Sequence, residues 1–533
     1  MAAPEGTPAA AAEMEEANDA SRPVVLISSD RVRSVREAVA ALQQRTDVFQ
    51  RGGILVHATR DAATAKWLVT PRGAPRIAQI PTSVLLLKIA DSATCKSYKR
   101  TEDGVKLLRC HPPHWLGKTI ADLGEWSAFP YLQAVTETPL LKPDGTILSN
   151  PGYDADTGIL FVPPCTYPRV PDRPTLEDVE RARRLLEAPF ADFPFAGNSH
   201  LGCAIAGILT IMARFAFRGP TPLFLVDAST AGSGKGLLVF VVCMIATGRE
   251  PGVAVASDGE ELRKTITAHA IAGSRTILLD NIIGEIGGSA LCAALTTTTW
   301  TDRVLGANVN YSGPLLPVWF TTGNNVTLGP DMHRRVCHVR LEPSSERPEE
   351  RTGFAVPDLR RWVEQHHAQL LTAALTILRG YCAVGRPDMG LTPWGSYEGW
   401  SALVRSAVVW AGWSDPGDAR DELRAAACTG DLAAKRLAYG WYLLGESTAA
   451  DAVETLYPRA PGGCPAVQRP LRDAIDELTR GKEVTAARLG KLLSKHRGRN
   501  LGGLKLDFVT VRGIGVWSST GTPDGTFSEG GGA

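Results

Sequence analysis

The sequence predicts an α/β protein whose central part is a three-layer core with a parallel sheet. From residue 222 to about residue 341, short apolar runs suited to buried strands alternate with helical segments, a pattern typical of parallel sheets. At the start of this part, an apolar run over residues 222–226 leads into a glycine-rich turn, and a helix is expected over residues 237–246. A strand, a glycine-rich turn and a helix in this order favour a loop that binds phosphate groups.

This loop lies within residues 221–236, TPLFLVDASTAGSGKG. Gly232 and Gly234 permit positive φ angles, so backbone N–H groups can point at phosphate oxygens, and the ammonium of Lys235 adds a positive charge. We therefore expect a site for a nucleoside triphosphate. Its nucleotide-binding residues are expected to be Ala231, Gly232, Ser233, Gly234, Lys235 and Gly236.

Two later strands end in polar side chains. Residues 275–281, RTILLDN, form an apolar strand from which Asp280 emerges at the carboxyl edge of the sheet, where ligands of open α/β folds bind. This carboxylate can hold Mg²⁺ against the phosphates. A strand over residues 318–321 leads into Thr322-Gly-Asn324-Asn325. The amide of Asn324 or Asn325 can hydrogen-bond the γ-phosphate and the attacking water, so one of them is the expected sensor.

A pair of arginines, Arg334 and Arg335, precedes a strand over residues 336–341. A guanidinium that cannot act on its own subunit's site can reach the γ-phosphate of a neighbour and stabilise charge developing there. Such action in trans requires a ring of subunits. The alternative is that both arginines form surface ion pairs.

The order of these motifs resembles the AAA+ ATPase core, and particularly the superfamily 3 helicases. The segments GSGKGLL, LLDN, WTDRVLG, FTTGNN and HRRVCHVRLE are similar to the helicase half of phage- and plasmid-type primase–helicase proteins, over roughly residues 222–342. The resemblance implies ATP and Mg²⁺ as cofactors and a ring-shaped homo-oligomer, expected to be a hexamer. It assigns phosphate binding to Lys235, Mg²⁺ to Asp280, sensing to Asn324 or Asn325, the arginine finger to Arg334 or Arg335, and DNA contact to Arg303.

The sequence departs from this resemblance at several positions. Ser229 stands where the loop usually has its first glycine, and Gly236 replaces the hydroxyl residue that normally binds magnesium. Asn281 stands where many such ATPases have the glutamate that orients water, which leaves the general base open; Glu285 is a substitute, or an ordinary solvated carboxylate. The first half has no paired-carboxylate signature of a primase. We predict no primer synthesis by this chain, and a separate primase or replication protein as a partner.

A local excess of positive charge lies near the C-terminus. Residues 480–512 contain nine lysines and arginines against two acids, whereas the whole chain has a net charge of +1. A helix over residues 485–496 is expected, with leucines on one side and basic residues on another, followed by a glycine-punctuated β-ribbon. This pattern predicts a winged helix that binds DNA, against the alternative of a solvated basic helix. The expected DNA-binding residues there are Arg488, Lys491, Lys495, Arg497 and Arg499.

The chain is long enough for several domains. We expect an accessory α/β region over 23–170, the ATPase core over 171–345, a helical segment over 346–445, the winged helix over 446–520, and disordered tails over 1–22 and 521–533. The tryptophans of the helical segment, Trp394, Trp400, Trp410 and Trp413, are interpreted as core residues rather than as a stacking surface for bases.

Composition favours a cytoplasmic protein, and the resemblance implies a bacterial or phage-infected cell. The ten cysteines contain no CxxC pair, which fits a reducing compartment better than a disulfide framework. The first residues lack the basic start and apolar centre of a signal peptide, and no apolar run is long enough to span a membrane.

These observations together predict an ATP-dependent DNA helicase or translocase of superfamily 3 type that acts in phage or mobile-element DNA replication. A second hypothesis is a non-translocating DNA-binding ATPase, such as a replication initiator or regulator that uses ATP as an assembly switch. A third is a small-molecule kinase. Strand displacement separates the first two hypotheses, and phosphate transfer to a metabolite would identify the third.

Overall fold

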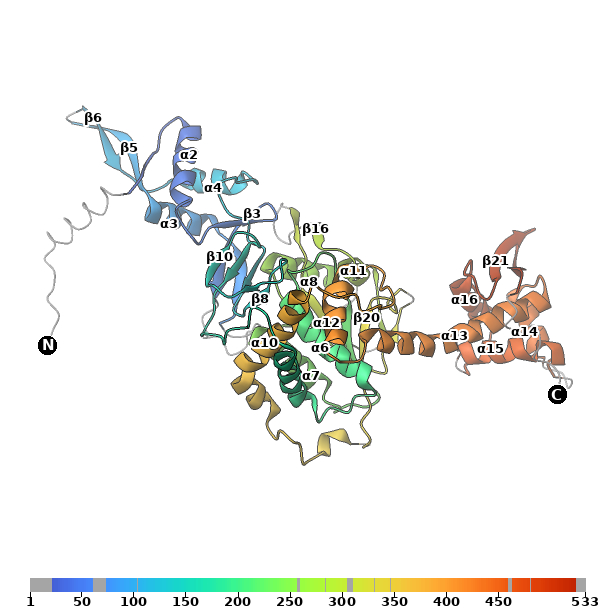
Figure 1. Cartoon of the computed structure of the whole chain (residues 1–533). Coiled ribbons are helices and arrows are strands. Elements are labelled where there is room, and N and C mark those ends of the chain that lie inside the picture. The colour runs from blue at the N-terminus through green and yellow to red at the C-terminus, as the bar shows by residue number, and fades with distance from the viewer. Residues whose placement is uncertain are drawn as a thin grey trace. The chain divides into compact units, whose positions relative to one another are not determined.

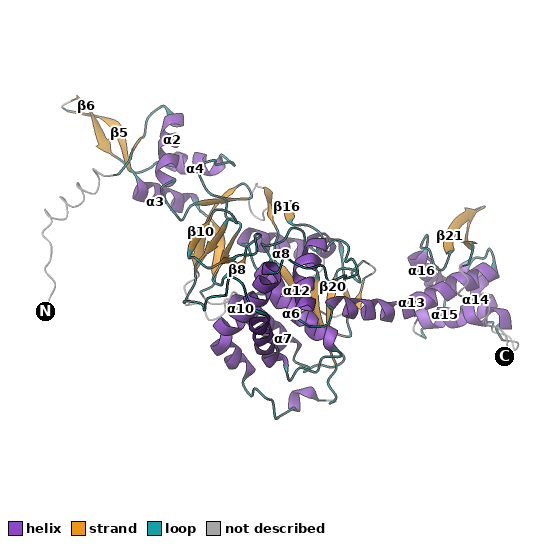
Figure 2. Cartoon of the chain, in the orientation of Figure 1, coloured by secondary structure: helices purple, strands orange, loops and turns teal. Residues whose placement is uncertain are grey.

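The computed structural model describes residues 22–60, 73–102, 104–255, 259–282, 284–303, 310–329, 331–345, 347–458, 463–479 and 481–523. The chain divides into two compact units, Met1–Arg420 and Asp421–Ala533, and helix α13 (Pro416–Leu444) contains the boundary. Figure 1 follows the elements along the chain, and Figure 2 shows that both units contain helices and strands. The expected tails lie almost entirely outside the described residues.

A five-stranded sheet forms the centre of the first unit, and each pair of adjacent strands within it is parallel. Its order is β13 (Val253–Val255), β14 (Thr276–Ile282), β18 (Val318–Asn324), β12 (Leu223–Ala228) and β20 (Val336–Leu341). The predicted α/β class and parallel sheet are confirmed. Strand β18 is longer than the sequence indicates, because Thr322 and Gly323 still pair with Val226 and Asp227 of β12. Asn324 is therefore the last residue of a strand and does not belong to a turn.

Long buried helices cover one face of this sheet. They are α6 (Asn198–Ala213) and α7 (Lys235–Thr247), and α10 (Leu359–Ala383) packs against both of them. Phe224 of β12 and Phe320 of β18 stack at 5.3 Å beneath them. Gly207 of α6 lies against Val242 of α7 and both rings, so that a Cβ there would meet Val242 at 3.2 Å. Burying this apolar face holds the strands, and therefore their carboxyl ends, in fixed register.

The remaining elements of this part surround the sheet. The helices are α5 (Leu176–Glu187), α8 (Gly259–Ala272), α9 (Ser289–Ala294), α11 (Glu398–Trp400) and α12 (Ser406–Trp410), and the strands are β15 (Glu285–Ile286), β16 (Thr299–Arg303), β17 (Asn310–Pro314) and β19 (Thr327–Leu328). Trp394 and Trp400 are buried, and their rings meet edge to face at 5.1 Å. Trp413 is also buried, and Trp410 packs against the same core. The interpretation of these tryptophans as core residues is confirmed.

The N-terminal part contains small sheets and short helices. The strands are β1 (Val24–Leu26), β2 (Phe49–Arg51), β3 (Ile54–Arg60), β4 (Pro75–Gln79), β5 (Thr94–Thr101), β6 (Gly104–Arg109), β7 (Ala134–Thr136), β8 (Leu140–Leu141), β9 (Ile147–Leu148), β10 (Gly152–Asp154) and β11 (Ile159–Phe161), and the helices are α2 (Arg31–Leu42), α3 (Thr82–Ser92) and α4 (His114–Asp122). The strands group as β1-β5-β6, β2-β3-β4, β10-β11-β7 and β8-β9.

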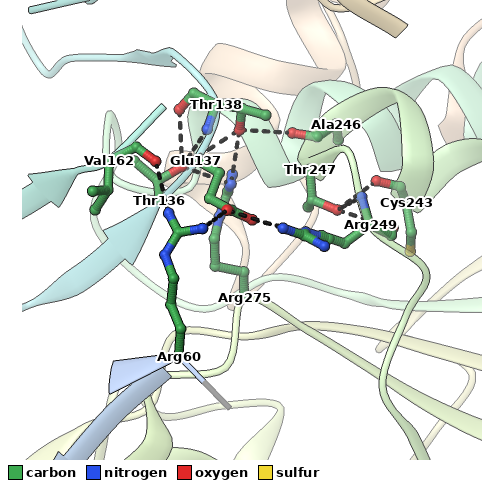
Figure 3. A network of polar contacts seen from close by, with 10 residues as sticks. All are labelled: Arg60, Thr136, Glu137, Thr138, Val162, Cys243, Ala246, Thr247, Arg249 and Arg275. Carbon is green, nitrogen blue, oxygen red and sulfur yellow. Dashed lines mark hydrogen bonds and ion pairs between the residues drawn. The ribbon is translucent and has the colours of Figure 1, made fainter. Parts of the chain in front are cut away.

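A buried carboxylate joins the N-terminal part to the central sheet (Figure 3). Glu137 is 5% exposed and pairs with Arg60 of β3 at 3.1 Å and with Arg249, which follows α7, at 2.8 Å. Arg275, next to the start of β14, donates hydrogen bonds to the hydroxyls of Thr136 and Thr138, each at 2.9 Å. Breaking such a buried pair would leave an uncompensated charge, so this network resists separation of the two parts.

The second unit has its own core. After α13 it contains α14 (Ala449–Leu456), α15 (Arg469–Thr479), α16 (Ala486–His496) and the hairpin of β21 (Leu504–Val511) and β22 (Ile514–Gly521). Leu489 and Leu493 of α16 and Trp517 of β22 are buried together. Arg512 and Gly513 both have positive φ angles, as the two-residue turn of a tight hairpin requires. The helix and ribbon expected from the sequence are confirmed.

Within the described residues, none of the helices combines the length and apolarity that crossing a bilayer requires.

Candidate nucleotide site

The glycine-rich loop connects the end of β12 to the start of α7. Gly232 has a φ of 72° and Gly234 a φ of 84°, the left-handed conformations for which the sequence has glycine. The Ser233 hydroxyl donates to the carbonyl of Thr230 at 2.6 Å and closes the turn. The first N–H groups of α7 have no partner within the helix and are available to an anion.

Lys235 reaches from the loop to the neighbouring strand. Its Nζ donates to Asn324 Oδ1 at 2.6 Å and to the carbonyl of Thr230 at 3.2 Å. The contact with Asn324 is possible because Ala228, the last residue of β12, is paired with Asn324 in the sheet. Burial lowers the pKa of Lys235, while the charges of Asp227 and Asp280 oppose this shift.

Asp280 lies at the exposed end of the next strand, β14. Its Oδ1 accepts a hydrogen bond from the Thr322 hydroxyl of β18 at 2.5 Å, and the same hydroxyl accepts one from the Asn281 backbone N–H at 2.8 Å. The register shifts between Leu279 and Ile282, and Asn281 has a φ of 51°. Such an irregularity at a strand end redirects a side chain. The carboxylate is thus oriented by a neighbouring strand and remains open to solvent.

The two asparagines that the sequence left equivalent have different contacts. Asn324 accepts from Lys235, whereas Asn325 donates to the Ser229 carbonyl at 3.2 Å and accepts from Arg340 Nη2 at 3.2 Å. Asn325 also has a positive φ, of 47°. Asn325 therefore ties the start of the loop to β20, and Asn324 is the one that faces the lysine.

Sequence reasoning missed the carboxylate beneath the loop. Asp227 of β12 is 5% exposed, accepts from Arg340 Nη1 at 2.6 Å and lies 3.7 Å from His338 Nε2. Burial by itself would raise the pKa of Asp227, but the interaction with His338 and the charge of Arg340 outweigh it and lower the pKa. An acid inside the apolar run LFLVDA was the available signal, because buried acids are rare unless paired.

A cavity of about 460 Å³ opens beside the loop. That volume is in the range of pockets that bind small molecules. Gly232, Gly234 and Leu237 form one wall, and Phe193 and Phe354 belong to the apolar part of the lining. Glu349 also lines this cavity, and a Cβ on Gly232 would lie only 2.6 Å from Glu349 Oε2. The sequence had no sign that a negative charge lies against the loop.

The paired arginines differ in exposure. The Arg334 side chain is 53% exposed and lies 3.6 Å from Asp331, while Arg335 is 8% exposed. Among the described residues, Nε and Nη1 of Arg335 have no hydrogen-bond partner. Only Arg334 therefore presents its guanidinium at the surface of the subunit.

Arg303 is the last residue of β16 and pairs with Asn310 of β17. It is exposed, and the following residues 304–309, which include the rest of the WTDRVLG segment, lie outside the described residues. The base of this hairpin is fixed by buried Trp300, whose Nε1 donates to the Thr267 hydroxyl of α8 at 2.9 Å. Arg303 is thus carried on an anchored hairpin.

The five basic residues predicted to bind DNA in the second unit are all exposed. Arg488, Lys491 and Lys495 lie on α16, and Arg488 donates to the carbonyl of Glu483. Arg497 lies 5.8 Å above the Phe508 ring and donates to the Phe508 carbonyl at 3.2 Å, while Arg499 lies 3.3 Å from His496 Nδ1. Arg497 also pairs with Asp507 of β21 at 3.4 Å, so the exposed basic residues continue from α16 to the base of the hairpin.

Fold and site together define an α/β protein with a parallel sheet and a glycine-rich loop of the phosphate-binding kind. Among solved structures, the chain is similar to the apo A form of the NrS-1 C-terminal region, with 12% identity over 87% of this chain and 95% of that chain and a TM-score of 0.36. It is also similar to the JCV helicase, with 12% identity over 44% of this chain and 66% of that chain and a TM-score of 0.20. No protein-family model and no curated protein matches the chain.

Proposed function

We propose that this protein is an ATP-dependent DNA helicase or translocase of superfamily 3 type. The observation that carries the proposal is the convergence of three adjacent strand ends: Lys235 after β12 contacts Asn324 of β18, and Thr322 of β18 contacts Asp280 of β14. A cation, an amide and an open carboxylate in a row beside a glycine-rich loop are the groups that a nucleotide phosphate chain and its metal need.

The residues fit a magnesium-bound nucleotide, since the exposed Asp280 carboxylate is an oxygen donor of the kind that Mg²⁺ prefers. Gly236 has no side-chain oxygen, so Asp280 and water would supply the ligands. When bound, ATP supplies the phosphoanhydride bond, and the metal neutralises charge on the phosphates. The loop N–H groups and Lys235 bind phosphate oxygens, Thr322 keeps the Asp280 carboxylate oriented, and the Asn324 amide positions water. Asn281 carries no carboxylate to accept the proton, so we expect slow hydrolysis.

DNA contacts are proposed at two places. Arg303 on its anchored hairpin would contact phosphates in the centre of a ring. The basic surface of α16 and the adjacent hairpin would bind DNA as a winged helix, within the proposed domain 446–520. The order of helices α14, α15 and α16 followed by the hairpin supports that assignment, as does the local charge of the segment 480–512.

The experiment that tests this proposal measures ATPase rate, oligomeric size and strand displacement on a forked, fluorescently labelled DNA. A helicase displaces the strand only with ATP. ATP-dependent assembly on DNA without displacement would instead support an initiator or regulator. This is the second candidate because Gly236 and Asn281 stand where a metal ligand and a catalytic glutamate are usual. A monomer that transfers phosphate to a metabolite would support a kinase.

Arg334→Ala is expected to lower the ATPase rate by about a thousand-fold while ATP still binds, because an arginine finger acts on the transition state. A finger acts on the neighbour, so mixing Arg334→Ala subunits with Lys235→Ala subunits should restore part of the activity. An interface in which the Arg334→Ala subunit supplies Lys235 and the Lys235→Ala subunit supplies Arg334 would then be intact, whereas the opposite orientation would lack both groups. The measurement is phosphate release from each variant alone and from the mixture.

Arg335→Ala serves as the control for this pair. Its guanidinium is buried, so we expect the substitution to change the thermal stability of the fold. Mixing Arg335→Ala subunits with Lys235→Ala subunits should restore no more activity than the mixture that contains Arg334→Ala. Full activity of Arg334→Ala within an intact ring would exclude it as the finger.

Glu349→Gln is expected to tighten nucleotide binding several-fold, since it removes a negative charge that lies against Gly232 where phosphates would bind. The measurement is a titration with a fluorescent ATP analogue. Glu350→Gln is the matched control, because Glu350 pairs with Arg347 at 3.1 Å and does not line the cavity. Unchanged or weaker binding by Glu349→Gln would show that this carboxylate does not oppose the nucleotide.

A further inference from the structure

The N-terminal part and the central sheet enclose a small cavity that the proposed function does not use. Its volume is about 10 Å³, roughly the space of one water molecule. Ser274 and Pro317, which precede β14 and β18, line one side, so the cavity lies at the edge where these parallel strands begin. The candidate nucleotide site lies at the opposite edge, where the same strands end. The cavity is therefore separate from the glycine-rich loop.

Three arginines that are far apart in the sequence line this cavity: Arg51, Arg214 and Arg275. Arg51 is 2% exposed and Arg214 is 4% exposed. Burial lowers the pKa of His269, which also lines the cavity, so its imidazole adds no charge near neutral pH. The lining residues that the structure describes include neither an aspartate nor a glutamate. The immediate surroundings of the cavity are thus strongly positive.

Two of these guanidiniums are held by neutral acceptors. Arg51 donates to four backbone carbonyls at distances from 2.5 to 3.3 Å, and these belong to Leu132, Gln133, Ala270 and Pro314. Arg275 donates to two threonine hydroxyls (Figure 3) and, at 3.1 Å, to the carbonyl of Ile211 in α6. Carbonyls and hydroxyls satisfy N–H groups but carry no net charge. The positive charges of Arg51 and Arg275 therefore remain.

Arg214, at the end of α6, differs from the other two. Its Nε has no hydrogen-bond partner among the described residues. Desolvation lowers the pKa of Arg214 to about 10, so the guanidinium is still charged near neutral pH. It lies 5.2 Å from the centre of the Phe217 ring, but such a cation–π contact stabilises an arginine much less than the loss of hydration costs. The burial of Arg214 is explained if a negative charge lies beside it.

Backbone dipoles and nearby acids do not balance the three charges. Helices α6 and α8 both end beside the cavity, and each C-terminus contributes about half a negative charge, which is about one charge against three guanidiniums. The charge of Glu137 also reaches Arg275. Glu137 is itself paired with Arg60 and Arg249, however. An excess of positive charge therefore surrounds a space large enough for one small group.

We propose that this cavity binds one small inorganic anion of the halide class, normally chloride, beside Arg214 and between Arg51 and Arg275. A halide ion is only slightly larger than a water molecule, whereas the four oxygens of a phosphate group need more room than this cavity has. A water molecule would fit, but it carries no charge that could offset the guanidiniums. The anion would connect β2 of the N-terminal part with α6 and the start of β14, and it requires no nucleotide.

The first test is the melting temperature of the full chain as chloride replaces gluconate at constant ionic strength. A ligand that binds only the folded protein stabilises it more as its concentration rises, so the melting temperature of the wild type should increase with chloride. We expect an increase of about 2 °C for each tenfold rise in chloride above the dissociation constant. Bromide should replace chloride, since it has the same charge and a similar size, whereas gluconate is too large to enter.

Arg214→Met should abolish this dependence on chloride, because it removes the guanidinium whose charge is unopposed. The matched control is Arg184→Met on α5, which removes the same charge from a side chain that is 72% exposed and should keep the wild-type dependence. If no anion binds, Arg214→Met should instead raise the melting temperature equally at every chloride concentration, since it removes a buried charge without a partner. That result, or a wild type that does not respond to chloride, would overturn the inference.

Bromide locates the site directly and does not depend on whether a variant folds. Crystals of the wild-type protein grown in sodium bromide should give an anomalous peak within hydrogen-bonding distance of the Arg214 guanidinium. Peaks at exposed arginines alone would indicate an adventitious ion only and would contradict the proposal. Neither experiment involves Lys235 or Asp280, so the anion site can fail while the proposed helicase function stands.

Discussion

Lys235→Ala is expected to reduce ATP hydrolysis by about a hundred-fold or more, the usual effect of removing a group that stabilises developing charge in a preorganised site. The reason is positional: Nζ is held 2.6 Å from Asn324 Oδ1, in the row of groups that leads to Asp280. Alanine removes both the charge and the cross-strand contact. Phosphate release and binding of a fluorescent ATP analogue should be measured on the same preparation.

The matched control for this variant is Lys264→Ala on α8, whose ammonium pairs with Glu261 at 2.8 Å on an exposed helix face. Its activity should equal that of the wild type. Asn324→Ala refines the test, because it should keep nucleotide binding while lowering the rate. If Lys235→Ala hydrolyses ATP as fast as Lys264→Ala, the glycine-rich loop is not the catalytic phosphate site, and the proposed function fails at its first step.

Asp227→Asn is expected to lower the free energy of unfolding by about 3–5 kcal/mol, as breaking one side of a buried ion pair does. Asp227 is 5% exposed, and its loss removes the 2.6 Å pair with Arg340 and leaves that guanidinium the longer contact to Glu342, at 3.5 Å. Arg340 also contacts Asn325, so the variant should loosen the start of the loop. The change in the free energy of unfolding is measured by urea denaturation, with tryptophan fluorescence as the signal.

The effect of this variant should depend on pH in one direction. The folded-state pKa of Asp227 lies below its ordinary value, so the ionised group contributes stability above the unfolded pKa, and this contribution is lost as pH falls through the folded pKa. The difference in the free energy of unfolding between wild type and Asp227→Asn should therefore be largest near neutral pH and should shrink below about pH 4. Replacing both partners, as Asp227→Leu/Arg340→Met, should recover part of the stability. A loss below about 1 kcal/mol would match an exposed ion pair and contradict the buried one.

Local sequence signals were sufficient for four of the five strands of the sheet and did not mark β13. Apolar runs marked β12, β14, β18 and β20 because buried parallel strands need them, and the glycines of the loop marked the positive φ angles at Gly232 and Gly234. The predicted end of β18 was wrong: the strand continues through Thr322 and Gly323, which look like a turn in the sequence. Pairing with β12 keeps them extended, and pairing depends on the neighbouring strand as well as on the residues themselves.

The candidate site was predictable in its parts but not in its contacts. Chain order indicated Lys235, Asp280 and the two asparagines, since each follows a strand that should end at the same edge. It did not indicate that Asn324 faces the lysine while Asn325 is held by Arg340. It also did not separate buried Arg335 from exposed Arg334, or reveal Glu349 beside Gly232.

By itself, the sequence determined the α/β class, the glycine-rich loop and the polar strand ends, because these depend on side-chain pattern and backbone freedom over a few residues. Only the tertiary structure decided which of those groups meet. The order β14-β18-β12-β20 sets Asn324 between Lys235 and the Thr322–Asp280 pair, and it brings Asp227 to Arg340. Strand order arises from packing of the whole apolar core, which joins residues far apart in the chain, so no local pattern encodes it.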